Sequence, residues 1–202
     1  MLSIIDYKMG NIRSVQKALE KLGFGSEITD DPVVIKRSKG IILPGVGSFG
    51  AAMANLKPLI PVIREEIAKN KPFLGICLGL QLIFESSDEN PGVNGMGLLK
   101  GHSKRFDLPH DMKVPHMGWN NIKINKKSPI LTGIPDGQQM YFVHSYYVVP
   151  EDKDVILTTT DYGMDFTSSI AKGNIFATQF HPEKSGEIGL EIYRNFGNMC
   201  SL

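Results

Sequence analysis

The first half of the chain alternates short apolar runs with segments of helical periodicity. Predicted strands lie at 2–5, 41–43 and 72–76. Predicted helices lie at 11–22, 58–69 and 78–85. The first of these helices has one apolar face, formed by Ile12, Val15, Leu19 and Leu22. This alternation is typical of a parallel sheet covered by helices.

The second half has the pattern of an antiparallel strand region. Predicted strands lie at 114–124, 140–149 and 155–160. Gly173 and Asn174 form a candidate hairpin turn before a strand at 175–180. A final helix carries Ile188, Ile192 and Phe196. Because no linker or repeat divides the chain, we predict a single α/β domain over 1–202, with a central, mostly parallel sheet flanked by helices and an additional antiparallel region.

Composition narrows the classes of function. The 22 basic and 21 acidic residues nearly cancel, so we expect neither nucleic-acid binding nor a polybasic membrane surface. The uncharged stretch 40–56 is interrupted by Pro44 and three glycines, and it is predicted as strand, loop and helix instead of a membrane span. The first ten residues lack the features of a secretory signal, which favours a cytoplasmic location. Two cysteines are too few for a disulfide framework, and their spacing predicts no metal site.

Cys77 is the candidate nucleophile. It lies between an apolar strand and a helical run, in the segment GICLG at 75–79, which is the context of a strand-to-helix elbow. Such a bend strains the nucleophile and crowds its neighbours, and glycines relieve the crowding. The helix N-terminus favours a thiolate, and the amide of Leu78 can donate to an oxyanion. A buried structural cysteine would give the same local pattern, and this is our interpretation of Cys200.

A thiol that attacks an acyl group needs a general base, and this base needs an acceptor to orient it. His181 follows the predicted strand 175–180, and Glu183 comes two residues later. In an extended segment, residues two apart project the same way, so the carboxylate can reach the imidazole. Five histidines compete for the role, and His144 is the second candidate.

Two further segments could complete a pocket around Cys77. The segment PGVG at 44–47 follows a predicted strand, and its glycines could turn the amide of Val46 towards an oxyanion that Leu78 also binds. Gln81 lies one helical turn beyond Cys77, so its amide can point back to the same place. An ordinary Pro/Gly turn and a solvated helix residue are the alternatives.

Two segments resemble the signatures of class I glutamine amidotransferases in their usual order and separation: GICLGLQ at 75–81 and TQFHPEKS at 178–185. Three others resemble the glutaminase subunits of imidazole glycerol phosphate synthases: PGVGSFG at 44–50, PHMGWN at 115–120 and YFVHSYY at 141–147. The resemblance covers almost the whole chain. Two departures, Lys8 in place of a frequent glycine and Leu80 in place of a frequent methionine, affect no catalytic position.

This resemblance implies a glutaminase that needs no cofactor. Cys77 would attack the side-chain amide of glutamine, His181 oriented by Glu183 would protonate the leaving ammonia, and water would release glutamate from the thioester. The amides of Val46 and Leu78 would hold the oxyanion. The family positions that bind glutamine correspond to Gly47, Gln81, Ser145 and Tyr146.

A protein partner is implied as well. In this family, ammonia passes through a separate barrel-shaped cyclase subunit to an imidazole-forming reaction of histidine biosynthesis, and the two chains form a heterodimer. Asn11, Trp119 and Asn120 match positions of the docking face. Judged by residue type alone, a lone tryptophan more often fills a core.

Other functions stay open at this point. The chain could serve another synthase, such as those that make anthranilate, guanylate or pyridoxal phosphate, although the GWN and SYY stretches argue against it. A non-amidotransferase cysteine hydrolase or a redox sensor that uses Cys77 would leave the context of Gln81 and Val46 without a purpose. A catalytically silent binding module would not need the intact set of Cys77, His181 and Glu183.

Overall fold

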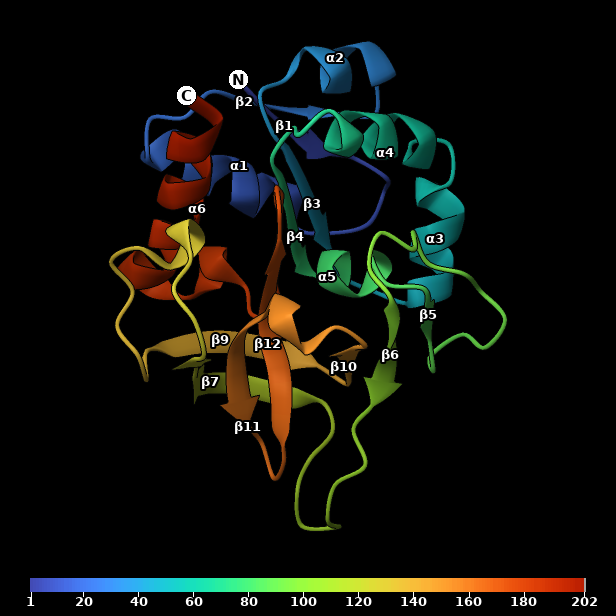
Figure 1. The fold of residues 1–202 in the computed structure, drawn as a ribbon, viewed down its shortest axis with the longest axis vertical. Helices are drawn as coiled ribbons and strands as arrows, with labels where there is room; N and C mark the ends of the chain where they lie inside the picture. Colours follow the sequence, from blue (N-terminus) through green and yellow to red (C-terminus); the bar gives the residue numbers. More distant parts are fainter. Residues whose placement is uncertain (202) are drawn as a thin grey trace.

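Five parallel strands form the centre of the fold in this computed structural model, which describes residues 1–201 (Figure 1). Their order across the sheet is β2 (Ser26–Thr29), β1 (Leu2–Ile5), β3 (Ile41–Gly45), β4 (Phe73–Cys77) and β13 (Ile175–Thr178). The inner strands are buried on both faces, because alternate residues enter different cores. In β4, Leu74 and Ile76 pack into one core while Phe73 packs into the other.

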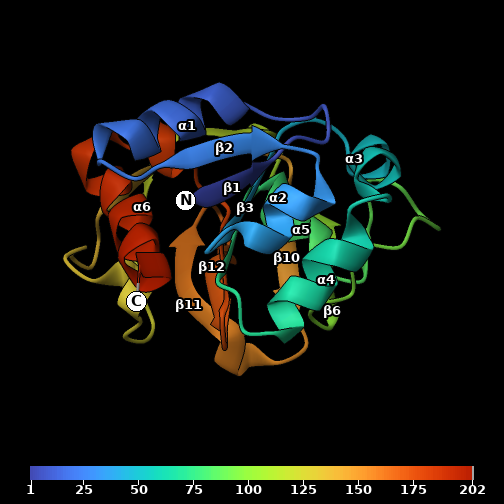
Figure 2. The same ribbon diagram turned by 90° about the horizontal axis from the view of Figure 1, so that it is seen from above.

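Helices cover both faces of this sheet. On one side lie α1 (Ile12–Lys21) and α6 (Gly186–Ser201), and on the other lie α2 (Pro32–Arg37), α3 (Phe49–Leu56) and α4 (Ile60–Ala68) (Figures 1 and 2). In α1 the predicted apolar face is the buried one, since Val15 and Leu19 are buried and Ile12 and Leu22 pack against the same core. The short helix α5 (Leu78–Leu82) follows β4.

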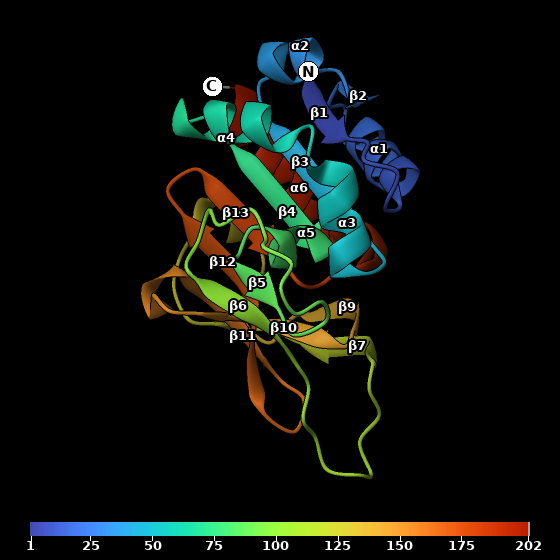
Figure 3. The same ribbon diagram turned by 90° about the vertical axis from the view of Figure 1, so that its right-hand side faces the viewer.

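Strands that pair antiparallel, except for the parallel pair β5 and β6, extend the sheet beyond β13 (Figure 3). The continuation runs through β12 (Asp165–Lys172), β10 (Tyr146–Pro150), β6 (Gly101–Arg105) and β5 (Ser86–Ser87), while β11 (Ile156–Asp161) pairs with β12 and with β8 (Lys123–Ile124). A separate two-stranded sheet consists of β7 (His116–Asn121) and β9 (Gln139–His144). Single 3-10 turns lie at Pro129–Leu131, Lys153–Val155 and Pro182–Lys184. The predicted fold class is confirmed.

The segment 140–149, predicted as one strand, is two strands in the structure. The buried positions alternate through Met140, Phe142 and His144, and this alternation slips after Ser145, where Tyr147 and Val148 are both buried. The carbonyl of Ser145 accepts a hydrogen bond from the amide of Phe106. The kink lets β9 pair with β7 while β10 joins the main sheet.

The helix predicted over 78–85 ends at Leu82. The carbonyls of Leu82, Ile83 and Phe84 accept hydrogen bonds from the amides of the segment 96–99, so this loop replaces the next helical turn. Strands β2 and β6 were not predicted, because their polar sequences SEIT and GHSKR carry little apolar signal. Within residues 1–201, no helix is both long enough and apolar enough to cross a membrane.

The close contact between α5 and β3 depends on Gly79. A Cβ at this position would lie 2.0 Å from the main-chain oxygen of Leu43, which cannot move aside without disturbing the sheet. We therefore expect Gly79→Ala to lower the free energy of unfolding by about 2 kcal/mol or more and the Tm by roughly 5 °C. Gly25→Ala is the matched control, because nothing lies within 4 Å of a Cβ there. Equal Tm values for the two variants in thermal unfolding would contradict the account.

Candidate active site

The chain bends sharply at Cys77, which is the last residue of β4 and directly precedes Leu78, the first residue of α5. Cys77 has a φ of 54°, which lies in the left-handed region that favours glycine. The backbone around it is crowded: a Cβ on Gly75 would lie 2.8 Å from the carbonyl oxygen of Gly79. The strained elbow with glycines on each side, predicted from the sequence, is thus confirmed.

His181 and Glu183 lie just beyond the end of β13 and form a closed pair. The Nδ1 atom of His181 is 2.8 Å from Oε1 of Glu183, and both side chains are 2% exposed. The second carboxylate oxygen accepts a hydrogen bond from the hydroxyl of Tyr193, at 3.0 Å. The backbone of His181 is held by Tyr141, whose carbonyl accepts its amide, and by the Ser185 hydroxyl, which donates to its carbonyl. The imidazole therefore has a fixed orientation and a fixed tautomer when neutral.

Cys77 lies beside the imidazole of His181, close enough to raise its pKa. Nε2 is buried and has no hydrogen-bond partner within residues 1–201. Burial by itself would lower the pKa of His181, but the neighbouring Cys77 sulfur and the Glu183 carboxylate outweigh burial and raise this pKa well above its ordinary value. Burial would likewise raise the pKa of Glu183, and the hydrogen bond from His181 outweighs it and lowers that pKa. The structure thus brings the three residues of the predicted triad together.

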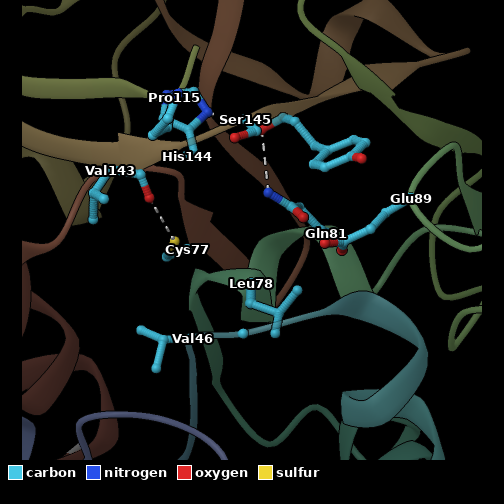
Figure 4. A pocket seen from close by; sticks show the side chains of 11 residues that line it. Val46, Cys77, Leu78, Gln81, Glu89, Pro115, Val143, His144 and Ser145 are labelled. Carbon is cyan, nitrogen blue, oxygen red and sulfur yellow. Dashed lines mark hydrogen bonds between the residues drawn. The ribbon is translucent and has the colours of Figure 1, made fainter.

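A cavity of about 330 Å³ opens beside the Cys77 sulfur (Figure 4). This volume lies in the range of about 300–1,000 Å³ that is usual for small-molecule sites. Residues predicted from the sequence line it: Val46, Gly47, Cys77, Leu78, Gln81, Ser145 and Tyr146. His181 and Glu183 are not part of its lining. In the cavity, Sγ of Cys77 lies 3.9 Å from the carbonyl oxygen of Val143.

The loop that carries Val46 lies next to the bend. Strand β3 pairs with β4 so that Gly45 is opposite Cys77. The hydroxyl of Tyr7 anchors the loop by donating to the carbonyl of Pro44, at 2.8 Å. Gly47 has a φ of 110°, a conformation that other residues adopt with strain. Both backbone segments predicted for the oxyanion hole, those of Val46 and Leu78, are therefore at the same end of the cavity as the sulfur.

Sequence reasoning missed Glu89, which is the carboxylate among the residues that line the cavity. In the view of Figure 4, Glu89 and Cys77 lie on opposite sides of Gln81. Its Oε2 accepts the amide of Phe49 at the start of α3, at 2.7 Å, which fixes the side chain. Glu89 sits in a turn-rich segment with no recognisable motif, so no sequence signal pointed to it. Pro115 and Val143 lie in segments that resemble the family, but no role was assigned to them. Tyr193 lies on the buried face of α6, where a tyrosine gives no sequence signal of a contact with Glu183.

His144, the second candidate for the base, is already engaged at both ring nitrogens. Nδ1 is 2.8 Å from the carbonyl oxygen of Tyr146, and Nε2 is 2.9 Å from Nδ1 of His116. A side-chain N–H of Asn120 reaches Nε2 of His116, at 3.2 Å. Burial lowers the pKa of His116 to about 4 and that of His144 to about 3, so both rings are neutral at pH 7. Neither ring can take a proton from Cys77 without breaking one of these hydrogen bonds.

Two of the three residues predicted for partner docking, Asn11 and Trp119, are exposed. Trp119 is 53% exposed on β7, and Met117, two residues earlier on the same side of the strand, is 62% exposed. Asn11 is exposed at the start of α1, and Asn120 is half-buried. The alternative that Trp119 fills the core is wrong. Its ring packs edge-on against Tyr141, and the ammonium of Lys184 lies 5.8 Å from the centre of the Tyr141 ring.

The site combines a cysteine on a strand-end elbow, a buried His–Glu pair and an adjoining cavity. The chain that carries it also matches a known family over nearly its entire sequence. The family described as glutamine amidotransferase class-I matches residues 3–199. The chain belongs to this family. Among the described residues, no group of three His, Cys, Asp or Glu side chains is arranged to hold a metal ion.

Curated relatives within the family carry a more specific name. The chain is 53% identical to imidazole glycerol phosphate synthase subunit HisH of Moorella thermoacetica over 98% of this chain and 94% of that protein. It is 49% identical to subunit HisH of Methanothermobacter thermautotrophicus, over 97% of each chain.

Solved structures support the fold. The structure titled PurLQS from Thermotoga maritima matches with a TM-score of 0.78 and 21% identity, over 98% of this chain and 97% of that one. The glutaminase domain of CTPS from Trypanosoma brucei matches with a TM-score of 0.69 and 16% identity, over 98% and 93%. At these identities the likeness concerns the fold alone.

The neutral pair His116 and His144 makes stability depend on pH. In the unfolded chain both histidines take up protons below about pH 6.5, whereas in the folded chain they do so only near pH 4 and pH 3. The unfolded state therefore binds more protons in this window, and stability falls as the pH falls from 6.5 towards 4. We expect His116→Gln to reduce this slope by up to about 1.4 kcal/mol per pH unit in urea unfolding. The exposed His110 provides the control variant, His110→Gln, and an equal slope in both variants would contradict the prediction.

Proposed function

We propose that Cys77, His181 and Glu183 are the catalytic triad of a glutaminase that hydrolyses glutamine to glutamate and ammonia, and that the chain is the glutaminase subunit of an imidazole glycerol phosphate synthase. One observation carries the catalytic part: a buried, carboxylate-oriented imidazole lies beside a sulfur that a strained bend presents to a cavity. The sequence identity to HisH subunits over nearly the full length supports the assignment to this synthase. Residues 1–202 act as one glutamine amidotransferase unit in this proposal.

The reaction follows from this arrangement. His181 accepts the thiol proton at Nε2, and Glu183 stabilises the resulting imidazolium. The sulfur attacks the side-chain carbonyl carbon of glutamine, and the amides of Val46 and Leu78 hold the oxyanion, each donor being worth about 3 kcal/mol. His181 then gives its proton to the departing ammonia. Water, activated by the same imidazole, releases glutamate from the thioester.

The far end of the cavity recognises the amino-acid end of the substrate. Free glutamine carries an α-ammonium group, and Glu89 is the carboxylate that lines the cavity. We assign Glu89 to that ammonium group, since an ion pair in a partly enclosed site is also a charge-assisted hydrogen bond. Gly47, Gln81, Ser145 and Tyr146 contact the remaining backbone and side-chain amide groups of glutamine.

Ammonia leaves towards a partner subunit with a barrel-shaped cyclase fold, which completes a heterodimer of histidine biosynthesis. Trp119 and Asn120 on β7 and Asn11 at the start of α1 form the docking face in this proposal. The exposure of Trp119 and Met117 supports it, because large exposed apolar side chains are typical of interfaces. A biosynthetic role of this kind agrees with a cytoplasmic location, with no nucleic acid, membrane or cofactor involved.

Removal of the sulfur tests the catalytic role directly. Cys77→Ala is expected to reduce ammonia release from glutamine by more than about 10³-fold, since the thioester cannot form. Co-purification with the cyclase subunit should be retained, because Cys77 is buried at the cavity and does not lie on β7. The control, Cys200→Ala, alters a buried cysteine at the other end of the sheet and should keep full activity. Glutaminase activity in the Cys77 variant would defeat the proposal.

Loss of the Glu89 charge should weaken substrate binding more than it slows the chemistry. We expect Glu89→Gln to raise the KM for glutamine about tenfold or more, because a hydrogen bond to a charged group is lost, with a smaller change in kcat. Steady-state assays of the two-subunit enzyme measure both constants. Glu151→Gln, which changes an exposed carboxylate away from the cavity, should leave them unaltered. An unchanged KM in the Glu89 variant would remove this residue from the site.

A further inference from the structure

A second polar side chain besides His181 approaches the Cys77 sulfur. Gln179 lies directly after β13 and is fully buried, and its main-chain amide donates to the carbonyl of Ser168. Its side-chain Nε2 lies 3.6 Å from Sγ of Cys77. Its Oε1 accepts a hydrogen bond from Nε2 of Gln81, at 3.3 Å.

The orientation of both amides follows from one main-chain carbonyl. The oxygen of Tyr146 can only accept, so Gln81, at 3.2 Å, must turn its N–H group towards it. The same Nε2 then donates to Gln179, which must present its oxygen to Gln81. The amide of Gln179 is planar, and its N–H group is therefore left facing the sulfur. If Gln179 were turned over, two nitrogen donors would face each other and a carbonyl oxygen would face the sulfur.

From this geometry we infer that Gln179 is a further catalytic residue, whose side-chain N–H group stabilises the Cys77 thiolate, and that Gln81 is the positioning residue that orients it. The inference rests on the proposed role of Cys77 as nucleophile. A hydrogen bond donated to a charged group favours its charged form, and it is stronger in a buried site than in water.

No covalent bond of Gln179 forms or breaks during the reaction. The proton of the thiol moves to Nε2 of His181, and the electron pair stays on sulfur, beside the Gln179 N–H group. When the sulfur attacks, the S–C bond forms and the charge moves to the carbonyl oxygen. The C=O bond then re-forms as the C–N bond breaks, and ammonia leaves with the proton from His181. When water attacks the thioester, the C–S bond breaks and the pair returns to sulfur. Gln179 thus acts at the two moments when the sulfur is an anion, as incoming nucleophile and as leaving group.

The test compares two replacements of similar size. Gln179→Met keeps an unbranched side chain of nearly the same length but has no donor, and Gln179→Glu places an acceptor against the sulfur. The readout is the rate of Cys77 alkylation by iodoacetamide at pH 7 without glutamine, followed on the Cys77 peptide by mass spectrometry so that Cys200 does not interfere. Gln16→Met, on α1 and away from the cavity, is the control.

We expect the alkylation rate to fall about tenfold in Gln179→Met and further in Gln179→Glu, with Gln16→Met equal to the unaltered protein. Gln81→Met should give a smaller fall, since the Gln179 amide is then free to turn. All variants should react alike in urea, where the pocket is absent. If both folded variants, Gln179→Met and Gln179→Glu, were alkylated at the rate of the unaltered protein, the inference would be overturned and Gln179 would be a purely structural residue.

The two proposals fail separately. Because alkylation is measured without glutamine, it reports on the sulfur and not on substrate binding. If Cys77→Ala still released ammonia, the proposed function would fail whatever the alkylation rates were. If Cys77→Ala were inactive but the Gln179 variants reacted normally, only the role of Gln179 would be rejected.

Discussion

The left-handed backbone conformation of Cys77 is the constraint on which the rest of the site depends. A residue with a side chain adopts such a φ at a cost of about 1–3 kcal/mol, so the surrounding structure must impose it. Here backbone atoms in close contact impose this conformation. Gly79 packs against the carbonyl of Leu43, and Gly75 against Gly79. Because the parallel pairing of β3, β4 and β13 is fixed by apolar burial on both faces, the bend cannot relax by moving a strand.

The same strand pairing determines what meets at the bend. Strand β13 runs beside β4, so the residues that follow it, Gln179 and His181, arrive next to the end of β4. The antiparallel region then supplies the opposite wall, with Val143, His144 and Tyr146 at the junction between β9 and β10. A nucleophile, its base and its pocket are therefore brought together by the ends of neighbouring strands, in agreement with the rule that sites in α/β sheets lie at the carboxyl ends of strands.

A continuous series of hydrogen bonds joins the exposed strand β7 to the sulfur. Asn120 donates to His116, His116 to His144, and His144 to the carbonyl of Tyr146, which also accepts from Gln81. Gln81 in turn contacts Gln179. Every member has a determined donor or acceptor role, because main-chain carbonyls at Asp161 and Tyr146 fix the direction. Fully satisfied buried networks of this kind make a pocket rigid.

The sequence predicts the parts of this structure that have strong local signals. The elbow at Cys77 and the apolar strands were predictable, since glycine spacing and burial act locally. Glu89 and the break at Ser145 were not, because their positions depend on loops that pack against α3 and β6. His144 and Gln179 are polar residues within apolar segments, and what they do depends on tertiary partners that no spacing reveals.

The most direct test of the account is the labelling of Cys77 by an electrophilic diazo-ketone analogue of glutamine, in the unaltered protein and in His181→Asn. The account predicts one adduct, on Cys77, and a labelling rate at least about 10²-fold lower in the variant, since the base that generates the thiolate is lost. An adduct on another residue, or an equal rate in both proteins, would contradict it.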